Sequence, residues 1–412
     1  MEQPGRPVGW WWRQYQLDQL ESYAAAWGLT VNAAKTQVVV FEGRGRRQQV
    51  PAPHPAPAGL AFSCAGDDIA IAEEFRYLGV QFHCRHAFST AGAARAQAGG
   101  RAVHATRRRC ADLGLHSAAV QLRLFDTMVL PALSYGAEIW APQLIAAGNR
   151  CAATRIHHAF LRQLLGVRQS TPALVLLAET RQRPLAARWA APLARFWNSV
   201  LDGEEDSLAR RALADSCALA EGAQAAQLAC KPWAGQVAAA LGTLGAAVSL
   251  EQPEPVSVPD LIQAGTDAFH TQLAAAQGTR ARQYVASTGV GAGDGSSGTR
   301  LPSYLLHIPQ RSRRRALAQL RTGSHWLAEE RGRWQQQQRG ERLCLHCAAA
   351  GEQHTETAEH AILHCPQSAA LRARYASLFV DGRAASLPAL LHAPDVLQLA
   401  SFCRDLCRLH CH

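Results

Sequence analysis

The sequence predicts an α+β protein that is mostly helical and is built from separate modules. Short stretches rich in β-branched and aromatic residues, which are typical of strands, occur in residues 1–88. A helical periodicity of apolar residues dominates residues 89–200. A cysteine–histidine pattern with metal-ligand spacing follows at residues 344–365. With 412 residues, 48% of them hydrophobic, the chain is long enough for about two or three domains.

The first 88 residues predict one helix followed by several short strands. Residues 14–27 form an amphipathic pattern that Gly28 ends. The apolar face of this helix consists of Leu17, Leu20, Tyr23, Ala24 and Trp27. Strands are predicted at 36–41, at 75–82, and in a hairpin of 60–64 and 69–72 around Ala65, Gly66 and Asp67.

Helices are predicted for most of the residues that follow, at 90–112, 117–130, 144–165, 172–180 and 184–200. Pro172 is expected at the first helical position behind Thr171, a favourable N-cap residue. Residues 203–300 are rich in Ala, Gln and Gly and have weak periodicity, so we interpret them as an insertion with a flexible linker at 289–298. Order resumes near Leu301, and a basic helix is expected at 311–328.

The net charge of +10 favours an anionic partner such as RNA or DNA. All but two of the 42 basic residues are arginine and alanine is abundant, so a GC-rich coding sequence explains part of this charge equally well. The sequence has no run of about 18 apolar residues and no N-terminal signal peptide, so we expect no membrane partner. The twelve cysteines are irregularly spaced, which is typical of reduced thiols in an intracellular compartment, nuclear or cytoplasmic.

Four residues near the C-terminus have the spacing of a structural zinc site. Cys344 and Cys347 form a CxxC pair, and His360 and Cys365 follow after a spacer of twelve residues. Thiolates and imidazoles are the ligands that Zn2+ prefers in tetrahedral structural sites. Pro366, directly after the last cysteine, stops a helix, which favours a metal site over four unrelated residues. The histidine is less certain than the cysteines, and the alternative ligands are His346, His354 and His364.

Several segments, in the same order along the chain, resemble the reverse transcriptases of non-LTR (LINE-type) retrotransposons. Residues 28–36, followed by a valine-rich stretch, and residues 75–80 are similar to the last two motifs of the family's palm. Residues 124–140 and 160–172 resemble the thumb of the family. Residues 320–325, 332–334 and 339–344 resemble the segment that leads into the family's C-terminal CCHC knuckle. The spacer between the CxxC pair and the histidine is longer in this chain than is usual in the family.

The resemblance implies an order of domains. It implies a palm remnant in residues 1–88, a helical thumb-like domain in 89–200, an insertion and linker in 201–300, and a basic helix with the zinc-knuckle region in 301–412. The family's catalytic carboxylates precede the segment that corresponds to 28–36, and this chain has no such pair there. Asp67 and Asp68 come too late along the chain to replace them and are interpreted as hairpin-turn residues. We therefore expect no Mg2+ and no polymerase activity, and Lys35, whose counterpart assists the departing pyrophosphate, is a vestigial candidate.

The resemblance and the charge pattern together indicate residues that contact nucleic acid. In the family, the segment corresponding to Phe75, Tyr77 and Gly79 forms a hairpin that grips the primer end. Basic side chains on the thumb-like helices and before the zinc motif are expected to follow phosphates. The alternatives are an ordinary core strand and solvated helix faces. The basic candidates are Arg107, Arg108, Arg109, Arg155, Arg162, Arg311, Arg313, Arg314 and Arg315.

The sequence thus predicts a truncated reverse-transcriptase-like protein that binds zinc and nucleic acid. One alternative is a fragment of a full-length, active RNA-directed DNA polymerase with a mis-assigned start, whose partner would be the missing palm segment or another retrotransposon chain. Another is a host protein that uses the zinc knuckle as a nucleic-acid adaptor. A second metal site near the C-terminus is less favoured than a frayed end. Its candidate ligands are Cys403, Cys407, His410, Cys411 and His412.

Overall fold

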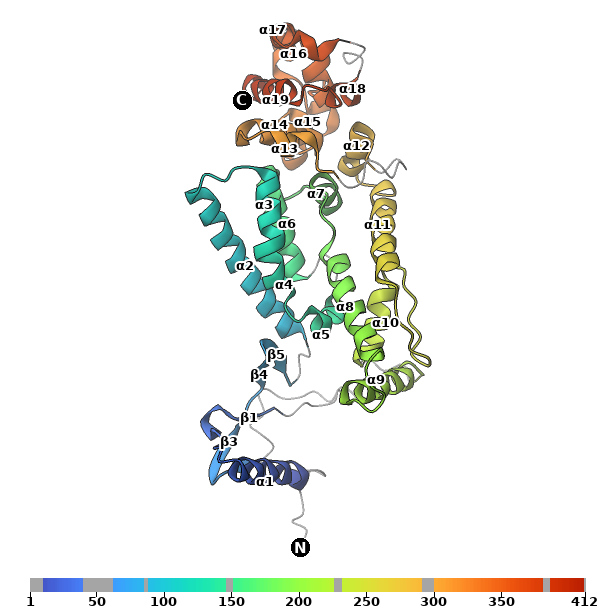
Figure 1. The fold of residues 1–412 in the computed structure, drawn as a ribbon. Coiled ribbons are helices and arrows are strands. Elements are labelled where there is room, and N and C mark those ends of the chain that lie inside the picture. Colours follow the sequence, from blue (N-terminus) through green and yellow to red (C-terminus); the bar gives the residue numbers. More distant parts are fainter. Residues whose placement is uncertain are drawn as a thin grey trace.

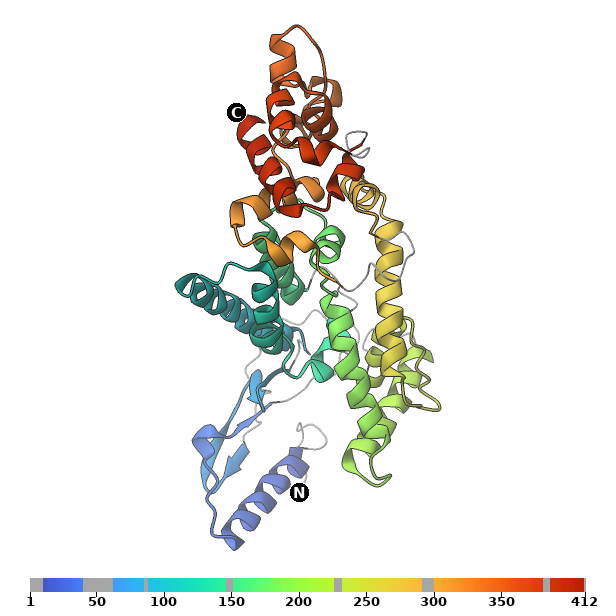
Figure 2. The same ribbon diagram turned by 45° about the horizontal axis from the view of Figure 1, so that its top comes forward.

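The elements of the chain form an elongated column (Figure 1). The computed structural model describes residues 10–39, 62–84, 88–145, 151–225, 232–290, 300–380 and 386–410, without the side chains of 10–13 and 223–225. These residues are mostly helical with a few short strands, as predicted. The strands lie at one end of the column, and the C-terminal helices lie at the other end in both views (Figures 1 and 2). None of the helices in the described part of the chain combines the length and the apolar character needed to span a membrane.

The N-terminal end consists of a helix packed on a small sheet. The Gln14 side chain exchanges two hydrogen bonds with the backbone of Ser63, at 2.9 and 3.1 Å, and so joins the helix to a strand. Within the predicted apolar face Ala24 is buried, whereas Tyr23 and Trp27 are exposed. The sheet has the order β1–β3–β2, in which β3 is parallel to β1 and antiparallel to β2. The elements are α1 (Trp10–Ala26), η1 (Ala33–Lys35), β1 (Gln37–Val38), β2 (Phe62–Cys64) and β3 (Asp67–Ile71).

Two tight hairpins depend on backbone with positive φ. Ala65 and Gly66 join β2 to β3, which confirms the first predicted hairpin. The prediction of one strand over 75–82 is wrong, because Leu78 (φ 46°) and Gly79 (φ 82°) reverse the chain. The aromatic and β-branched pattern continues through this turn and therefore concealed it. The strands of the second hairpin are β4 (Glu74–Tyr77) and β5 (Val80–His83).

The helices predicted between residues 90 and 200 are present, but those at 117–130 and 144–165 are each divided. In the first, Pro131 has no N–H, and the N–H of Leu130 bonds to the Phe125 carbonyl in a π turn. Pro172 is an N-cap and not the first helical residue. The elements are α2 (Ser89–Asp112), α3 (Ala118–Leu124), η2 (Phe125–Val129), α4 (Leu130–Ser134), α5 (Ala137–Ile145), α6 (Ala152–Leu165), α7 (Ala173–Thr180) and α8 (Leu185–Leu201).

Four helices lie in the described parts of residues 203–290, for which the sequence predicted no regular elements. Alanine favours helices but gives little contrast between their faces, which explains the weak periodicity. Asn198 of α8 fixes the segment before α11 through bonds of 2.8 Å to the N–H and the carbonyl of Val256. The predicted linker at 289–298 lies almost entirely outside the described residues. The helices are α9 (Leu208–Ala225), α10 (Trp233–Gly242), α11 (Val258–Ala274) and α12 (Thr279–Thr288).

The basic helix predicted at 311–328 is shorter, and a second helix follows it. Gly323 has a φ of 61°, and the N–H of Ser324 bonds to the Gln319 carbonyl at 2.8 Å, which ends the first helix. The elements are α13 (Ser303–His307), α14 (Arg311–Arg321), α15 (Ala328–Trp334), η4 (Arg339–Glu341), α16 (Leu345–Ala349), η5 (His360–His364), η6 (Pro366–Ser368), α17 (Ala369–Arg374), η7 (Ala376–Phe379), α18 (Leu387–Leu391) and α19 (Val396–His410).

One continuous hydrophobic core extends from Ala91 in α2 to Leu406 in α19. Trp140 and Trp189 are fully buried in it and meet edge to face, with ring centres 5.1 Å apart. Helices of the 89–200, 201–300 and 301–412 segments all contribute to this core. The C-terminal cysteine–histidine region is therefore supported by helices that are distant in sequence.

Candidate metal centre and basic residues

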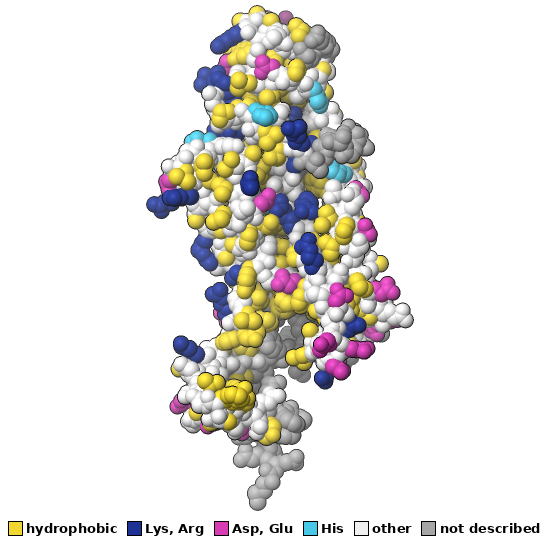
Figure 3. All heavy atoms as spheres, in the orientation of Figure 1, with side chains coloured by type: hydrophobic (Ala, Val, Ile, Leu, Met, Phe, Trp, Pro, Cys, Tyr) yellow, Lys and Arg dark blue, Asp and Glu magenta, His cyan; other side chains and the backbone are white. Residues whose placement is uncertain are grey.

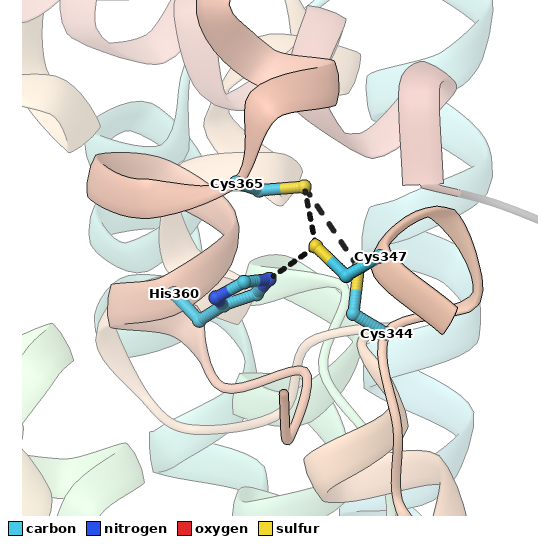
Figure 4. Close-up of side chains that lie close together, drawn as sticks. All are labelled: Cys344, Cys347, His360 and Cys365. Atoms are coloured by element: carbon cyan, nitrogen blue, oxygen red, sulfur yellow. Dashed lines mark hydrogen bonds between the residues drawn. The ribbon is translucent and has the colours of Figure 1, made fainter. Parts of the chain in front are cut away.

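The first turn of a short helix places Cys344 and Cys347. Cys344 is the N-cap of α16, and its carbonyl accepts a hydrogen bond from the N–H of Ala348 at 2.9 Å. The N–H of Cys344 donates to the carbonyl of His354 at 2.8 Å, so the chain returns beside this helix. As a result the two thiols are close to the remaining predicted ligands (Figure 4).

His360 and Cys365 are placed by a π turn. The N–H of Cys365 donates to the carbonyl of His360 at 2.7 Å, a bond that spans five residues. In an α-helix, side chains five residues apart diverge by about 140°. The wider π turn reduces this divergence and brings both side chains to one side. Pro366 begins the next turn, η6, directly after the site.

Three of the separations among the four donor atoms match the edges of a tetrahedral zinc site (Figure 4). The Sγ of Cys365 lies 3.8 Å from that of Cys344 and 3.9 Å from that of Cys347. The Nε2 of His360 lies 3.4 Å from the Sγ of Cys347. Zn–S bonds of about 2.3 Å and Zn–N bonds of about 2.0 Å correspond to tetrahedral edges of about 3.8 and 3.5 Å. The structure thus brings the four predicted ligands together in a cluster that can hold a metal ion.

Burial makes the thiols of Cys344 and Cys347 hard to ionise without a cation. It raises the pKa of Cys344, and burial together with the neighbouring Cys344 and Cys365 raises the pKa of Cys347 to about 12. Burial also lowers the pKa of His360, which favours the neutral imidazole. A bound divalent cation stabilises the thiolates and releases their protons. Three sulfurs and one imidazole suit Zn2+, whereas Mg2+ prefers oxygen ligands.

The alternative histidines lie outside this cluster. His354 is exposed, and its ring stacks on that of His360 with centres 5.2 Å apart. His364 is exposed, and the ring of His346 meets that of His410 edge to face at 5.2 Å. Among the histidines that the structure describes, His360 is the one whose nitrogen joins the three sulfurs.

A buried glutamate–histidine pair adjoins the metal centre. The Nδ1 of His410 lies 2.8 Å from a carboxylate oxygen of Glu356, and both residues are 1% exposed. The other oxygen of Glu356 accepts a hydrogen bond from the N–H of Ala328 at 2.6 Å. The Nε2 of His410 lies 3.1 Å from the Oγ of Ser368. These contacts connect α19 to α15 and η6 beside Cys344, and no sequence pattern links residues so far apart.

Among the described residues of the last helix, Cys403 and Cys407 belong to no group of three or more potential metal ligands, whereas His410 groups with Glu356 and Cys344. Cys403 and Cys407 lie on α19, but His410 faces Glu356. Burial raises the pKa of Cys403 to about 12, which is consistent with a core residue. Cys411 and His412 lie outside the described residues.

Lys35, Asp67 and Asp68 are solvent-exposed. Lys35 ends the short turn η1, where its N–H donates to the Asn32 side chain at 3.2 Å. Asp67 and Asp68 are the first two residues of β3, so the turn itself consists of Ala65 and Gly66 and not of the aspartates as predicted. In the described part of the chain, neither aspartate belongs to a group of three or more potential metal ligands.

The tip of the β4–β5 hairpin is fixed by a tyrosine and presents two apolar side chains to solvent. Tyr77 is 59% exposed and Leu78 is 74% exposed, whereas Phe75 is partly buried. The hydroxyl of Tyr135 donates to the Leu78 carbonyl at 2.9 Å. A Cβ added to Gly79 would lie 2.7 Å from the Tyr135 ring, so the close approach requires glycine. Contact between this tip and a primer end stays a prediction.

The predicted basic residues fall into different environments. Arg107, Arg311 and Arg314 line one cavity, although α2 and α14 are distant in sequence. Arg162 donates to the Thr171 carbonyl at 3.1 Å. Basic side chains are spread over the middle and upper parts of the face in Figure 3, whereas acidic ones gather near α9. Arg313 is partly buried, and the exposed members are Arg108, Arg109, Arg155 and Arg315.

Comparisons with protein-family models, with curated proteins and with solved structures find no match for this chain. Its function is therefore inferred from its own residues. Four protein ligands fill the tetrahedron of a zinc ion and leave no position open for water or substrate. A zinc ion held by these four residues would organise the fold around it and would not carry a reactive metal-bound water.

Proposed function

We propose that this chain binds nucleic acid through a structural zinc knuckle and the basic side chains around it, as a protein that resembles non-LTR reverse transcriptases. The observation that carries the proposal is the tetrahedral spacing of three sulfurs and one imidazole nitrogen in the CCHC motif. Zinc knuckles are common readers of single-stranded nucleic acid. The net charge of +10 supports an anionic partner.

In this proposal the metal joins two short elements, α16 and η5, at the cysteine–histidine cluster. The local core around the site consists of Cys344, Cys347 and Cys365. With Zn2+ bound, the thiolates and His360 would hold α16 and η5 together and would position the basic segment before them. Binding through arginine–phosphate contacts is then expected to be largely independent of sequence and strongly dependent on salt.

The test combines metal analysis with a binding titration. The purified chain is expected to contain one zinc ion per molecule and to bind a labelled single-stranded oligonucleotide more weakly at 200 mM than at 50 mM salt, by about tenfold or more. The variant Cys344→Ser should lose both the metal and most of the affinity. Cys84→Ser, which removes a thiol outside the cluster, should retain both. Full binding by metal-free Cys344→Ser protein would overturn the role proposed for the knuckle.

We also propose that the chain has no polymerase activity of its own. The proposal follows from the resemblance, in which Asp67 and Asp68 do not correspond to the catalytic carboxylates of the family, and from the exposed positions of Lys35, Asp67 and Asp68. Templated nucleotide incorporation by the purified chain with Mg2+ is the measurement that decides this. Incorporation would favour the alternative of an active RNA-directed DNA polymerase.

A further inference from the structure

A cavity of about 160 Å3 lies between the C-terminal end of α2, the segment that follows it, α6 and the first turn of α14. Its charged lining residues are Arg107 from α2 and Arg311 and Arg314 from α14. Gln163 of α6 contributes an amide. No Asp or Glu is among the lining residues that the structure describes. The cavity therefore carries three guanidinium groups without a neutralising carboxylate.

Arg314 is a fixed part of this cavity. It is 4% exposed, and its Nη1 donates to the carbonyls of Ile308 and Pro309, both at 2.7 Å. Its Nη2 donates to the carbonyl of His116 at 2.5 Å. The Nε of Arg314 is buried and has no hydrogen-bond partner. Backbone carbonyls orient this guanidinium, but they do not neutralise its charge, and one of its donors remains unsatisfied.

Arg107 and Arg311 complete the basic lining and are more accessible. Arg107 is partly buried and donates to the side-chain oxygen of Gln163. Arg311 is exposed and is the first residue of α14, whose N-cap Gln310 makes no side-chain capping bond and whose first turn has no acidic residue. A helix start of this kind leaves N–H groups unpaired and carries partial positive charge, which favours an anion.

The three guanidinium groups oppose one another electrostatically. Burial, and to a smaller extent the charge of Arg311, lower the pKa of Arg107 and that of Arg314. An arginine does not relieve such repulsion by losing its proton. None of the ion pairs formed by the described residues includes any of these three arginines. A bound anion would offset this charge more fully than solvent does.

We infer that this cavity binds one phosphate group of a nucleic-acid strand. Phosphate matches the fork of N–H donors on a guanidinium, and its charge compensates several arginines at once. Arg107 and Arg311 are more accessible than Arg314, so a strand on the surface can place a phosphate beside them while backbone carbonyls keep Arg314 fixed. The inference rests on the proposed function and names a contact that lies far from the zinc ligands in sequence.

The test compares two pairs of substitutions that remove the same charge from the full-length protein. Arg107→Gln with Arg311→Gln changes the cavity, whereas Arg211→Gln with Arg282→Gln changes exposed side chains that do not line it. The double substitution in the cavity is expected to weaken binding of a single-stranded oligonucleotide about tenfold. It should also reduce the slope of log binding constant against log salt concentration by about one. The control pair is expected to lower affinity less than threefold. Equal losses for both pairs would overturn the inference and leave the proposed function standing.

A conservative variant and an inorganic probe separate the remaining explanations. Gln163→Glu keeps the shape of the side chain and places a carboxylate on Arg107, so it should reduce oligonucleotide binding without lowering Tm. Unchanged oligonucleotide affinity for Gln163→Glu would overturn the inference.

Inorganic phosphate should raise the Tm of the unmodified chain but not that of the Arg107→Gln, Arg311→Gln protein. Stabilisation by inorganic phosphate without any oligonucleotide binding would overturn both the proposed function and the assignment of a strand to the cavity. An unmodified chain that binds oligonucleotide with no effect of phosphate on its Tm would overturn the cavity alone.

Discussion

The carboxylate of Glu179 and the guanidinium of Arg321 form a buried pair, with separations of 2.7 and 3.3 Å. Glu179 is fully buried and also accepts hydrogen bonds from the hydroxyls of Tyr284 at 2.9 Å and Tyr304 at 2.7 Å. Burial alone would raise the pKa of Glu179, but Arg321 and the two hydroxyls hold it below the usual value. One carboxylate thus connects α7, α12, α13 and α14.

Replacing Glu179 by Gln is expected to destabilise the chain by about 3–5 kcal/mol, because Arg321 would keep its charge in the core without a counter-ion. Tyr304→Phe removes one hydroxyl and leaves the ion pair, so its cost should be only about 1–2 kcal/mol. Urea unfolding followed by circular dichroism measures both values. If Glu179→Gln lowered the free energy of unfolding no more than Tyr304→Phe does, the ion pair would not be the main source of stability at this site.

Replacing His410 by Leu is expected to lower the free energy of unfolding by about 2–4 kcal/mol. The substitution leaves one oxygen of Glu356 and the hydroxyl of Ser368 without their partner in a buried region. Because the pair adjoins Cys344, the variant should also lose zinc at a lower concentration of chelator than the unmodified chain. His392→Leu removes an exposed histidine and serves as the control.

The features that were predicted correctly depend on local signals. The CxxC pair, the histidine–cysteine pair and Pro366 are each encoded within a few residues, and the structure brings these ligands together. The helix at 89–112 and the hairpin around Gly66 are local in the same sense. Short-range patterns therefore account for the candidate metal centre and for most helices before residue 200.

The features that the sequence did not predict depend on tertiary contacts. Glu356 and His410 meet only because α19 packs across the metal region, and Arg107 meets Arg311 only because α14 packs near the end of α2. The helices at 203–290 were missed because alanine stretches have no clear apolar stripe. Leu78 adopts positive φ without the glycine or asparagine that usually indicates it, so the second hairpin was missed.

Acid is expected to destabilise the chain below about pH 6.5 through three buried histidines. Burial lowers the pKa of His157 well below its usual value, that of His158 to about 4 and that of His325 to about 3. The unfolded chain takes up protons near pH 6.5 whereas the folded chain does not, so stability is lost as pH falls from 6.5 toward 4. Each histidine lowers the free energy of unfolding by up to about 1.4 kcal/mol for each pH unit of acidification.

The variant His157→Leu tests this origin of the acid sensitivity. Both ring nitrogens of His157 are buried without a hydrogen-bond partner, so an apolar side chain of similar size removes a titrating group without breaking a bond. Urea unfolding at pH 7.5, 6 and 5 should show a shallower loss of stability than in the unmodified chain. His104→Gln, at an exposed position of α2, should leave the pH dependence unchanged.

Metal removal is expected to unfold the region around α16 and η5 before the rest of the chain. Structural zinc contributes on the order of 10 kcal/mol to the folding of small modules, and the local core here is the cysteine cluster itself. Treatment with a chelator should lower Tm, and Zn2+ but not Mg2+ should restore it. Substitution with Co2+ should give the absorption bands of a tetrahedral site with thiolate ligands. Restoration by Mg2+ would contradict a thiolate site.

Replacing Gly79 by Ala is expected to displace the tip of the β4–β5 hairpin. A Cβ at this position would lie 2.7 Å from the Tyr135 ring, and the φ of 82° is unfavourable for alanine. The hydrogen bond from Tyr135 to the Leu78 carbonyl should then be lost, with a total cost of about 1–3 kcal/mol. Tyr135→Phe removes the hydroxyl alone and should cost about 1 kcal/mol. Hydrogen exchange of residues 74–83 distinguishes the two effects, because Gly79→Ala should increase exchange along the hairpin, whereas Tyr135→Phe should change it only near the tip.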